Sequence, residues 1–195
     1  MAKIRSAWEI ALEKTENITI DREKLKKDEN IKKARILIGA YLNDDENDGS
    51  SLADELKQID DEAAVKTALK LSAIQNLTLP SDTVLTDRYE RIANIIAIAC
   101  GNNPNIMELT GQIISFVKQF PEHRKQLVDQ LKEQFAPMLE QKAAQLKAQY
   151  GQEVPVSLEN DPEFLKIANT QLEKLQKQYD ETLAGAKAQL EAALS

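Results

Sequence analysis

An acidic stretch between residues 43 and 62 holds the strongest candidate for chemistry in this chain of 195 residues. It contains one Lys and nine Asp or Glu residues, while the formal charge of the whole chain is −7. A calcium loop needs several oxygen ligands, a glycine at its tight turn, and a final bidentate carboxylate. Gly49 stands at the turn position of that pattern, and the spacing predicts five ligands: Asp44, Glu46, Asp48, Ser50 and Glu55.

This loop departs from the calcium pattern at two positions. Glu46 is longer than the Asp or Asn usual at the third position, and Ser51 stands where an aliphatic residue is usual. The sequence also has no second loop of this kind to pair with it. Two interpretations stay open: weak binding of a divalent cation such as Ca²⁺, and a solvated acidic loop between two helices. We expect no other cofactor.

Side chains for covalent catalysis are scarce. Cys100 is the only cysteine and His123 the only histidine. Cys100 ends an apolar segment, where a thiol packs as a small hydrophobic group. His123 stands in a first helical turn, whose dipole disfavours a cation, and one Cys with one His cannot form a structural zinc site. We therefore expect no enzymatic activity, and an enzyme that uses scattered carboxylates is the third hypothesis.

A basic run from Arg22 to Arg35 predicts a solvated helix face. It contains no aromatic residue, which a nucleic-acid surface would interleave with the charges. Acidic residues stand four positions before Lys27, Lys32 and Lys33, the favourable order for ion pairs along a helix. The negative net charge also opposes binding to nucleic acid or to anionic membranes.

The hydrophobic residues recur at helical spacing along nearly the whole chain, and strand-like alternation is nearly absent. The predicted fold is therefore all-α, with helix in more than about 70% of residues, against about a third in an average protein. Capping residues, glycines and prolines divide the pattern. Asp61, Asn103 and Asp161 are expected N-caps, Ser51 and Asp87 each begin an expected capping pair, and Gly101 is expected to stop the helix over residues 88–100. That helix is the most apolar and is expected at the centre of the core, and Leu25 is expected on the inner face of the helix over residues 21–41. The expected helices cover residues 4–17, 21–41, 51–59, 61–76, 88–100, 104–120, 121–150 and 162–194.

The last two of these helices are long, on the order of 45–50 Å each. Pro121 is expected to begin the first of them and Pro137 to kink it. We therefore expect a compact bundle of short helices over residues 1–120 and a long antiparallel hairpin over residues 121–195. Along the last helix runs a seam of apolar residues at heptad-like spacing: Leu165, Leu172, Leu175, Tyr179 and Leu190.

This seam supports the main functional hypothesis, a non-enzymatic interaction or scaffold protein. Extended apolar strips on soluble proteins usually mark contacts. We expect a protein partner or a second copy of the chain to bind helices 121–150 and 162–194. The hairpin either docks on the bundle of residues 1–120 or pairs with a second copy, and pairing with a second copy is slightly favoured. The alternative is a regulatory module that binds a divalent cation at residues 44–55.

The single tryptophan, Trp8, shares the apolar face of the first expected helix with Ile4, Ala11 and Leu12. We interpret it as an anchor for helix packing, and an exposed anchor for a partner is the alternative. Glu9 and Glu13 interrupt any apolar core of a secretory signal. The longest apolar run, Ile95–Cys100, is far shorter than the ~20 residues of a membrane span, so we expect a cytoplasmic protein.

The opening Lys3-Ile4-Arg5-Ser6-Ala7-Trp8, continued to Thr15, resembles the start of a family of uncharacterised bacterial all-helical proteins of similar length. The resemblance extends over most of the chain. It implies a helical domain of unknown function, and it transfers neither an activity nor any site residue.

Overall fold

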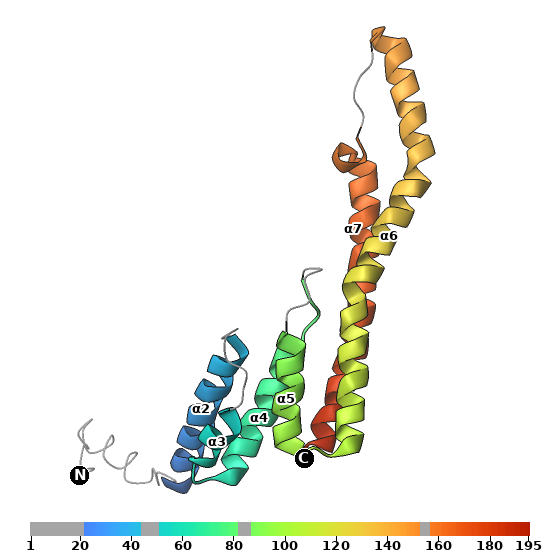
Figure 1. Ribbon diagram of the computed structural model, residues 1–195. Helices are drawn as coiled ribbons and strands as arrows, with labels where there is room; N and C mark the ends of the chain where they lie inside the picture. The colour runs from blue at the N-terminus through green and yellow to red at the C-terminus, as the bar shows by residue number, and fades with distance from the viewer. Residues whose placement is uncertain (1–21, 44–50, 82–86, 153–156) are drawn as a thin grey trace, which may run out of the picture.

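The computed structural model describes residues 22–43, 51–81, 87–152 and 157–195. Helix makes up 87% of these residues and they contain no strand, so the predicted all-α class is confirmed. The expected helix over residues 4–17 lies outside the described part of the chain. The elements are α2 (Arg22–Asn43), α3 (Leu52–Lys57), α4 (Glu62–Asn76), α5 (Arg88–Cys100), α6 (Pro104–Tyr150), the short 3₁₀ helix η1 (Leu158–Asn160) and α7 (Pro162–Ala193) (Figure 1).

Three predicted N-caps are confirmed. The Asp61 side chain accepts a hydrogen bond from the Ala64 amide at 2.9 Å, and Asn103 accepts one from Asn105 at 3.1 Å. Asp161 accepts from the amides of Glu163 and Phe164, at 2.9 and 3.1 Å. These bonds satisfy amides that have no partner inside their helix.

The predicted capping bonds of Ser51 and Asp87 are wrong. Ser51 has φ −91° and ψ −20°, and Asp87 has φ −62° and ψ 0°, and neither side chain makes a capping hydrogen bond. A cap residue normally has extended backbone, which directs its side chain back to the first amides. Both residues are instead close to helical geometry.

The predicted helix boundary at Pro121 is wrong. Helix α6 runs through Pro121 and Pro137 without ending, for 47 residues. An interior proline costs about 3 kcal/mol of helix stability, but Val117, one turn before Pro121, and Phe120, directly before it, pack into the protein and are only 0% and 7% exposed. The axis of α6 bends in its middle part (Figure 1), as prolines inside a helix cause. The division into residues 1–120 and 121–195 thus falls inside a helix, and two separate domains stay a prediction.

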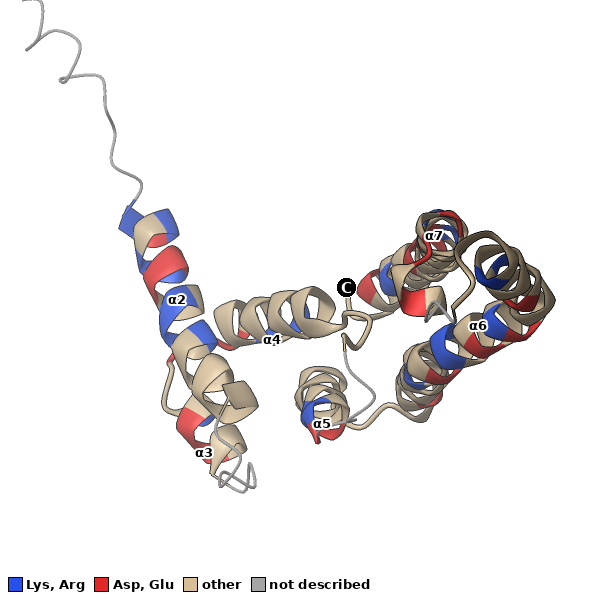
Figure 2. Cartoon of the chain, turned by 90° about the horizontal axis from the view of Figure 1, so that it is seen from above, with Lys and Arg blue, Asp and Glu red and all other residues tan. Residues whose placement is uncertain are grey.

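The helices stand in a row from α2 through α4 and α5 to α6, with α3 beside α2 (Figures 1 and 2). Helix α7 returns antiparallel along α6 (Figure 1). Its last turns also meet α4, where the Lys70 ammonium lies 2.7 Å from the Ser195 hydroxyl.

The main core is centred on α5, as predicted. Ile92, Ile95 and Ile96 of this helix are fully buried. Around them pack side chains from the other helices, among them Ala34 and Ile38 of α2, Leu52 and Leu56 of α3, Ala68 and Leu69 of α4, Ile113 and Val117 of α6, and Leu183 and Leu190 of α7. The N-terminal part of α6 and the C-terminal half of α7 therefore belong to the main core.

A buried polar contact that the sequence analysis missed joins α5 to α2. The guanidinium of Arg91, a residue only 8% exposed, donates to the Tyr41 carbonyl at 2.5 Å and lies over the Tyr41 ring at 5.4 Å. The Asn94 amide donates to the Tyr41 hydroxyl at 3.0 Å. Leu25, expected on the inner face of α2, is instead 52% exposed, because residues 22–29 are exposed on every side of the helix. The basic side chains from Arg22 to Arg35 are exposed as predicted.

Candidate interaction surface

The α6–α7 hairpin has two halves with different surroundings. We call residues 104–120 with 176–193 the proximal half, and residues 121–150 with η1 and residues 162–175 the distal half. All hairpin residues of the main core lie in the proximal half. The distal half has a second, smaller core in which Leu131, Phe164 and Ala168 are buried, with Leu127, Phe135, Leu158 and Ile167 around them.

The small distal core is organised by aromatic packing between the two helices. The rings of Phe135 in α6 and Phe164 in α7 are 5.4 Å apart and cross at 73°, an edge-to-face arrangement. Phe164 is 4% exposed and Leu131 is 7% exposed. Edge-to-face pairs place the positive edge of one ring on the negative face of the other, so this contact fixes the start of α7 against α6.

An ion pair closes the same end of the hairpin. The Lys142 ammonium donates to the Asp161 carboxylate at 2.6 Å, while Asp161 also caps α7. The hydrogen bond from Lys142, and after it that from the Phe164 amide, holds the pKa of Asp161 below its ordinary value of 3.8. The same bond raises the pKa of Lys142 above 10.5. Both groups are therefore charged at neutral pH.

An aromatic cluster marks the junction between the two halves. The Tyr179 ring stacks on Phe116 at 4.6 Å and meets the edge of Phe120 at 5.0 Å. Its hydroxyl lies 2.5 Å from Nδ1 of His123. Burial raises the pKa of Tyr179 above 10.0, so the hydroxyl keeps its proton and can donate to that nitrogen.

Exposed apolar side chains gather at the distal half. Within the described residues, five large hydrophobic side chains are strongly exposed, and three of them belong to the distal half. They are Met138, Tyr150 and Leu165, at 44%, 61% and 41% exposure. In Figure 1 the end of α6 extends past the start of α7, away from the other helices. No described element covers these three side chains.

The predicted seam on α7 is only partly the buried face. Tyr179 and Leu190 are buried, and Leu172 and Leu175 are half-buried, but Leu165 is exposed. Phe164 and Leu183, which the heptad spacing missed, are buried instead. A straight helix has 3.6 residues per turn, so its buried face drifts away from a strict 3.5-residue repeat. Phe164 stands directly before Leu165, and its large aromatic side chain is the sequence feature that could have identified it as the buried residue of the two.

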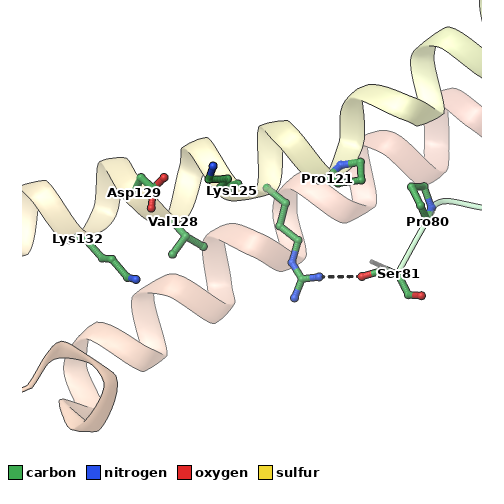
Figure 3. A pocket seen from close by; sticks show the side chains of 8 residues that line it. Pro80, Ser81, Pro121, Lys125, Val128, Asp129 and Lys132 are labelled. Carbon is green, nitrogen blue, oxygen red and sulfur yellow. Dashed lines mark hydrogen bonds between the residues drawn. The ribbon is translucent and has the colours of Figure 1, made fainter. Parts of the chain in front are cut away.

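Two hollows flank the loop after α4, where it meets the hairpin. The first, of about 310 Å³, lies between Pro80 and Ser81 of the loop and Val128 and Lys132 of α6 (Figure 3). The Arg124 guanidinium donates to the Ser81 carbonyl at 3.4 Å. The second, of about 420 Å³, lies on the α7 side and includes Leu172 and Glu173. Their linings mix basic, acidic and apolar groups, so they indicate no single ligand chemistry.

The predicted calcium ligands lie almost entirely outside the described residues. Asp44, Glu46, Asp48 and Ser50 belong to residues 44–50, and only Glu55 is described, half-buried on α3. Among the residues that the structure describes, no three Asp, Glu, His or Cys side chains form a group able to hold a metal ion. Cation binding at residues 44–55 stays a prediction.

The single cysteine and the single histidine have separate surroundings. The Cys100 thiol lies 3.7 Å from the Ala97 carbonyl at the end of α5, whereas His123 contacts Tyr179 on the hairpin. In the described residues, no helix combines the length and the apolar character that a membrane span requires.

Comparison with known proteins identifies one family. The model of a family of unknown function, DUF6657, matches residues 53–192, which include both halves of the hairpin. The expectation of an uncharacterised family is thus confirmed, although residues 3–15, on which the resemblance was based, precede the matched range. No curated protein and no solved structure matches the chain significantly.

Proposed function

Because the chain belongs to the family of unknown function DUF6657, we propose a function from its own surface: the distal half of the hairpin binds a helical protein partner, and that partner is a second copy of the chain. The observation that carries the proposal is the exposure of Met138, Tyr150 and Leu165 on an end that extends beyond the other helices. The proximal half is unsuited to this role, because its apolar face is used in the main core.

The geometry of the distal half favours a helix as the partner. Met138 and Tyr150 are twelve residues apart on one helix, about 18 Å along its axis at 1.5 Å per residue. At 100° per residue the two side chains also lie about 120° apart around α6, so a pair of partner helices reaches both better than one straight helix does. The α6–α7 hairpin of a second copy supplies such a pair.

The charge of the distal half is compatible with self-association. Residues 138–150 and 157–168 contain three lysines and four acidic residues, so this end is nearly neutral within a chain of charge −7. Two identical surfaces of low net charge repel each other little. A twofold axis through the contact would pair each exposed side chain with the same patch of the other copy.

Sedimentation of the full chain over a range of concentrations tests the proposal. We expect a dimer that dissociates on dilution and that is lost in the double variant Met138→Glu/Tyr150→Glu. The matched control is Leu25→Glu/Ile36→Glu, which changes two equally exposed apolar residues of α2, at 52% and 63% exposure. Circular dichroism establishes that the helix content is unchanged. A wild-type monomer at every concentration, or equal behaviour of the two double variants, would contradict the proposal.

A further inference from the structure

Helix α2 has an outer face that the main core does not use. On its inner face, Ala34 and Ile38 are fully buried. About half a turn around the helix, at 100° per residue, runs a line of four exposed side chains: Leu25, Glu29, Lys32 and Ile36. The two apolar members of this line are 52% and 63% exposed, and α2 stands at one end of the row of helices (Figure 2). No described element therefore covers this outer face.

The spacing of these four residues is the same in both directions along the helix. They stand four, three and four positions apart, which is the alternation found along a coiled-coil seam. A second copy of α2 that lies antiparallel therefore presents the same spacing to the first. Leu25 then packs against Ile36 of the second copy, and Glu29 lies against its Lys32. The outer face is complementary to itself in both shape and charge.

We propose that the outer face of α2 binds the outer face of α2 in a second copy, as an antiparallel pair of helices. The two ends of the contact are apolar, and its centre holds two ion pairs, each between Glu29 of one copy and Lys32 of the other. Neither residue makes an ion pair within the described part of the chain, so both charges can serve this contact. A twofold axis between the helices relates the two ion pairs.

This contact is separate from that of the hairpin, and it is weaker. Each copy contributes only two apolar side chains. Residues 22–36 hold seven basic and three acidic residues, so the two copies of α2 carry net charge of the same sign. Repulsion between the bases beside the seam opposes the attraction of the two ion pairs. We therefore expect this contact only above the concentrations at which hairpin dimers form, where it joins those dimers into larger assemblies.

Sedimentation of Met138→Glu/Tyr150→Glu at high protein concentration measures the α2 contact alone, because the hairpin surface is changed in that variant. We expect a dimer that dissociates on dilution. Adding Lys32→Glu should weaken this dimer about tenfold, because acidic side chains then face each other at both central positions. Adding Glu29→Lys as well reverses both ion pairs and should return the dissociation constant to within about threefold of its first value.

The matched control is Lys27→Glu, which makes the same change of charge at an exposed residue of α2 away from the outer face. Both single substitutions lower the net positive charge of the helix equally. If net charge alone governed the contact, both would therefore strengthen it. Under the proposal, only Lys32→Glu weakens it. Circular dichroism establishes that each variant keeps its helix content.

Three results would overturn the proposal. The first is a Met138→Glu/Tyr150→Glu variant that is monomeric at every concentration. The second is an equal effect of Lys32→Glu and Lys27→Glu, and the third is a charge-reversed double variant that stays as weak as Lys32→Glu. A monomeric chain that cosediments with vesicles of phosphatidylglycerol would likewise overturn it, and would assign the outer face to an anionic membrane.

The two proposed contacts can fail separately. In a chain that is otherwise wild type, Leu25→Glu/Ile36→Glu should remove the assemblies larger than a dimer and leave the hairpin dimer intact. Failure of the hairpin proposal would instead make this variant monomeric. Larger assemblies that persist in Leu25→Glu/Ile36→Glu would contradict the α2 contact and leave the hairpin proposal standing.

Discussion

The proximal and distal halves of the hairpin are made of the same two helices, yet the other helices bury the apolar side chains of only the proximal half. In the proximal half, Leu183 and Leu190 of α7 are 4% and 0% exposed, because they complete the core around α5. In the distal half, Met138 and Leu165 are 44% and 41% exposed. Apolar residues of the same two helices thus complete the main core along one half, while along the other half some form a small separate core and others stay exposed. Only the free half is a candidate for binding.

The largest expected effect tests whether the proximal half belongs to the global core. Leu190→Ala should destabilise the protein by about 2–5 kcal/mol, the usual range for a fully buried leucine. Leu165→Ala, on the same helix but exposed, should cost less than about 1 kcal/mol. Urea denaturation followed by circular dichroism measures both. Similar costs for the two substitutions would remove the distinction between the halves.

The sequence predicted the helices of this fold better than it predicted which of their side chains are buried. Helical spacing, the caps Asp61, Asn103 and Asp161 and the stop at Gly101 were sufficient for most helix boundaries, since these are local properties of the chain. The boundary at Pro121 was wrong, because tertiary packing of Val117 and Phe120 decides whether a helix continues through a proline. The roles of Leu25 and Leu165 were equally out of reach, because exposure depends on which distant element packs there.

The candidate site was predictable only in outline. The last two helices stood out by their length and apolar spacing, and the structure directs attention to the distal half of that same pair. Its binding role remains a proposal, as does the calcium loop, whose first four ligands lie outside the described residues. No spacing rule could have found the Arg91–Tyr41 contact or the Tyr179–His123 contact, because their partners are 50 and 56 residues apart.

A smaller effect is expected at the junction of the two halves. Tyr179→Phe removes the hydroxyl that lies 2.5 Å from His123 and keeps the stacked ring, so it should cost about 1 kcal/mol, the net value of one hydrogen bond. Tyr150→Phe, at 61% exposure in the distal half, is the control and should change stability by less than ~0.5 kcal/mol. Thermal denaturation of both variants measures the difference. Equal melting temperatures would show that the junction contributes nothing through this hydroxyl.

Replacing two glycines of α6 with alanine should change the stability of the protein in opposite directions. Gly111 is inside the helix, and no atom lies within 4 Å of an added Cβ, so Gly111→Ala should stabilise the protein by about 0.5–1 kcal/mol through helix propensity. Gly151 ends α6 with φ +71°, where alanine is strained, so Gly151→Ala should destabilise the distal end. Calorimetry should show a higher melting temperature for the first variant. Hydrogen exchange should show faster opening at the end of α6 for the second, and a loss of stability in Gly111→Ala would instead indicate a helix packed closely on that face.

The smallest effect concerns the charge that closes the distal half, and it depends on pH. Asp161→Asn keeps an oxygen that can accept from the Glu163 and Phe164 amides, but it loses the attraction to Lys142. The pKa of Asp161 is lowered below 3.8 in the folded protein, so its charge stabilises the hairpin above that pH, and this contribution is lost as the pH falls through the folded pKa. The pKa of Lys142 is raised above 10.5, so its contribution is complete below that pH and is lost as the pH rises through the raised pKa.

Hydrogen exchange at the start of α7 should therefore be faster in Asp161→Asn than in the wild type at neutral pH, with a difference that diminishes below about pH 4. Exchange in the proximal half should be equal in the two proteins, because the ion pair lies at the distal end of the hairpin. A change in the proximal half would mean that the two halves open as one unit.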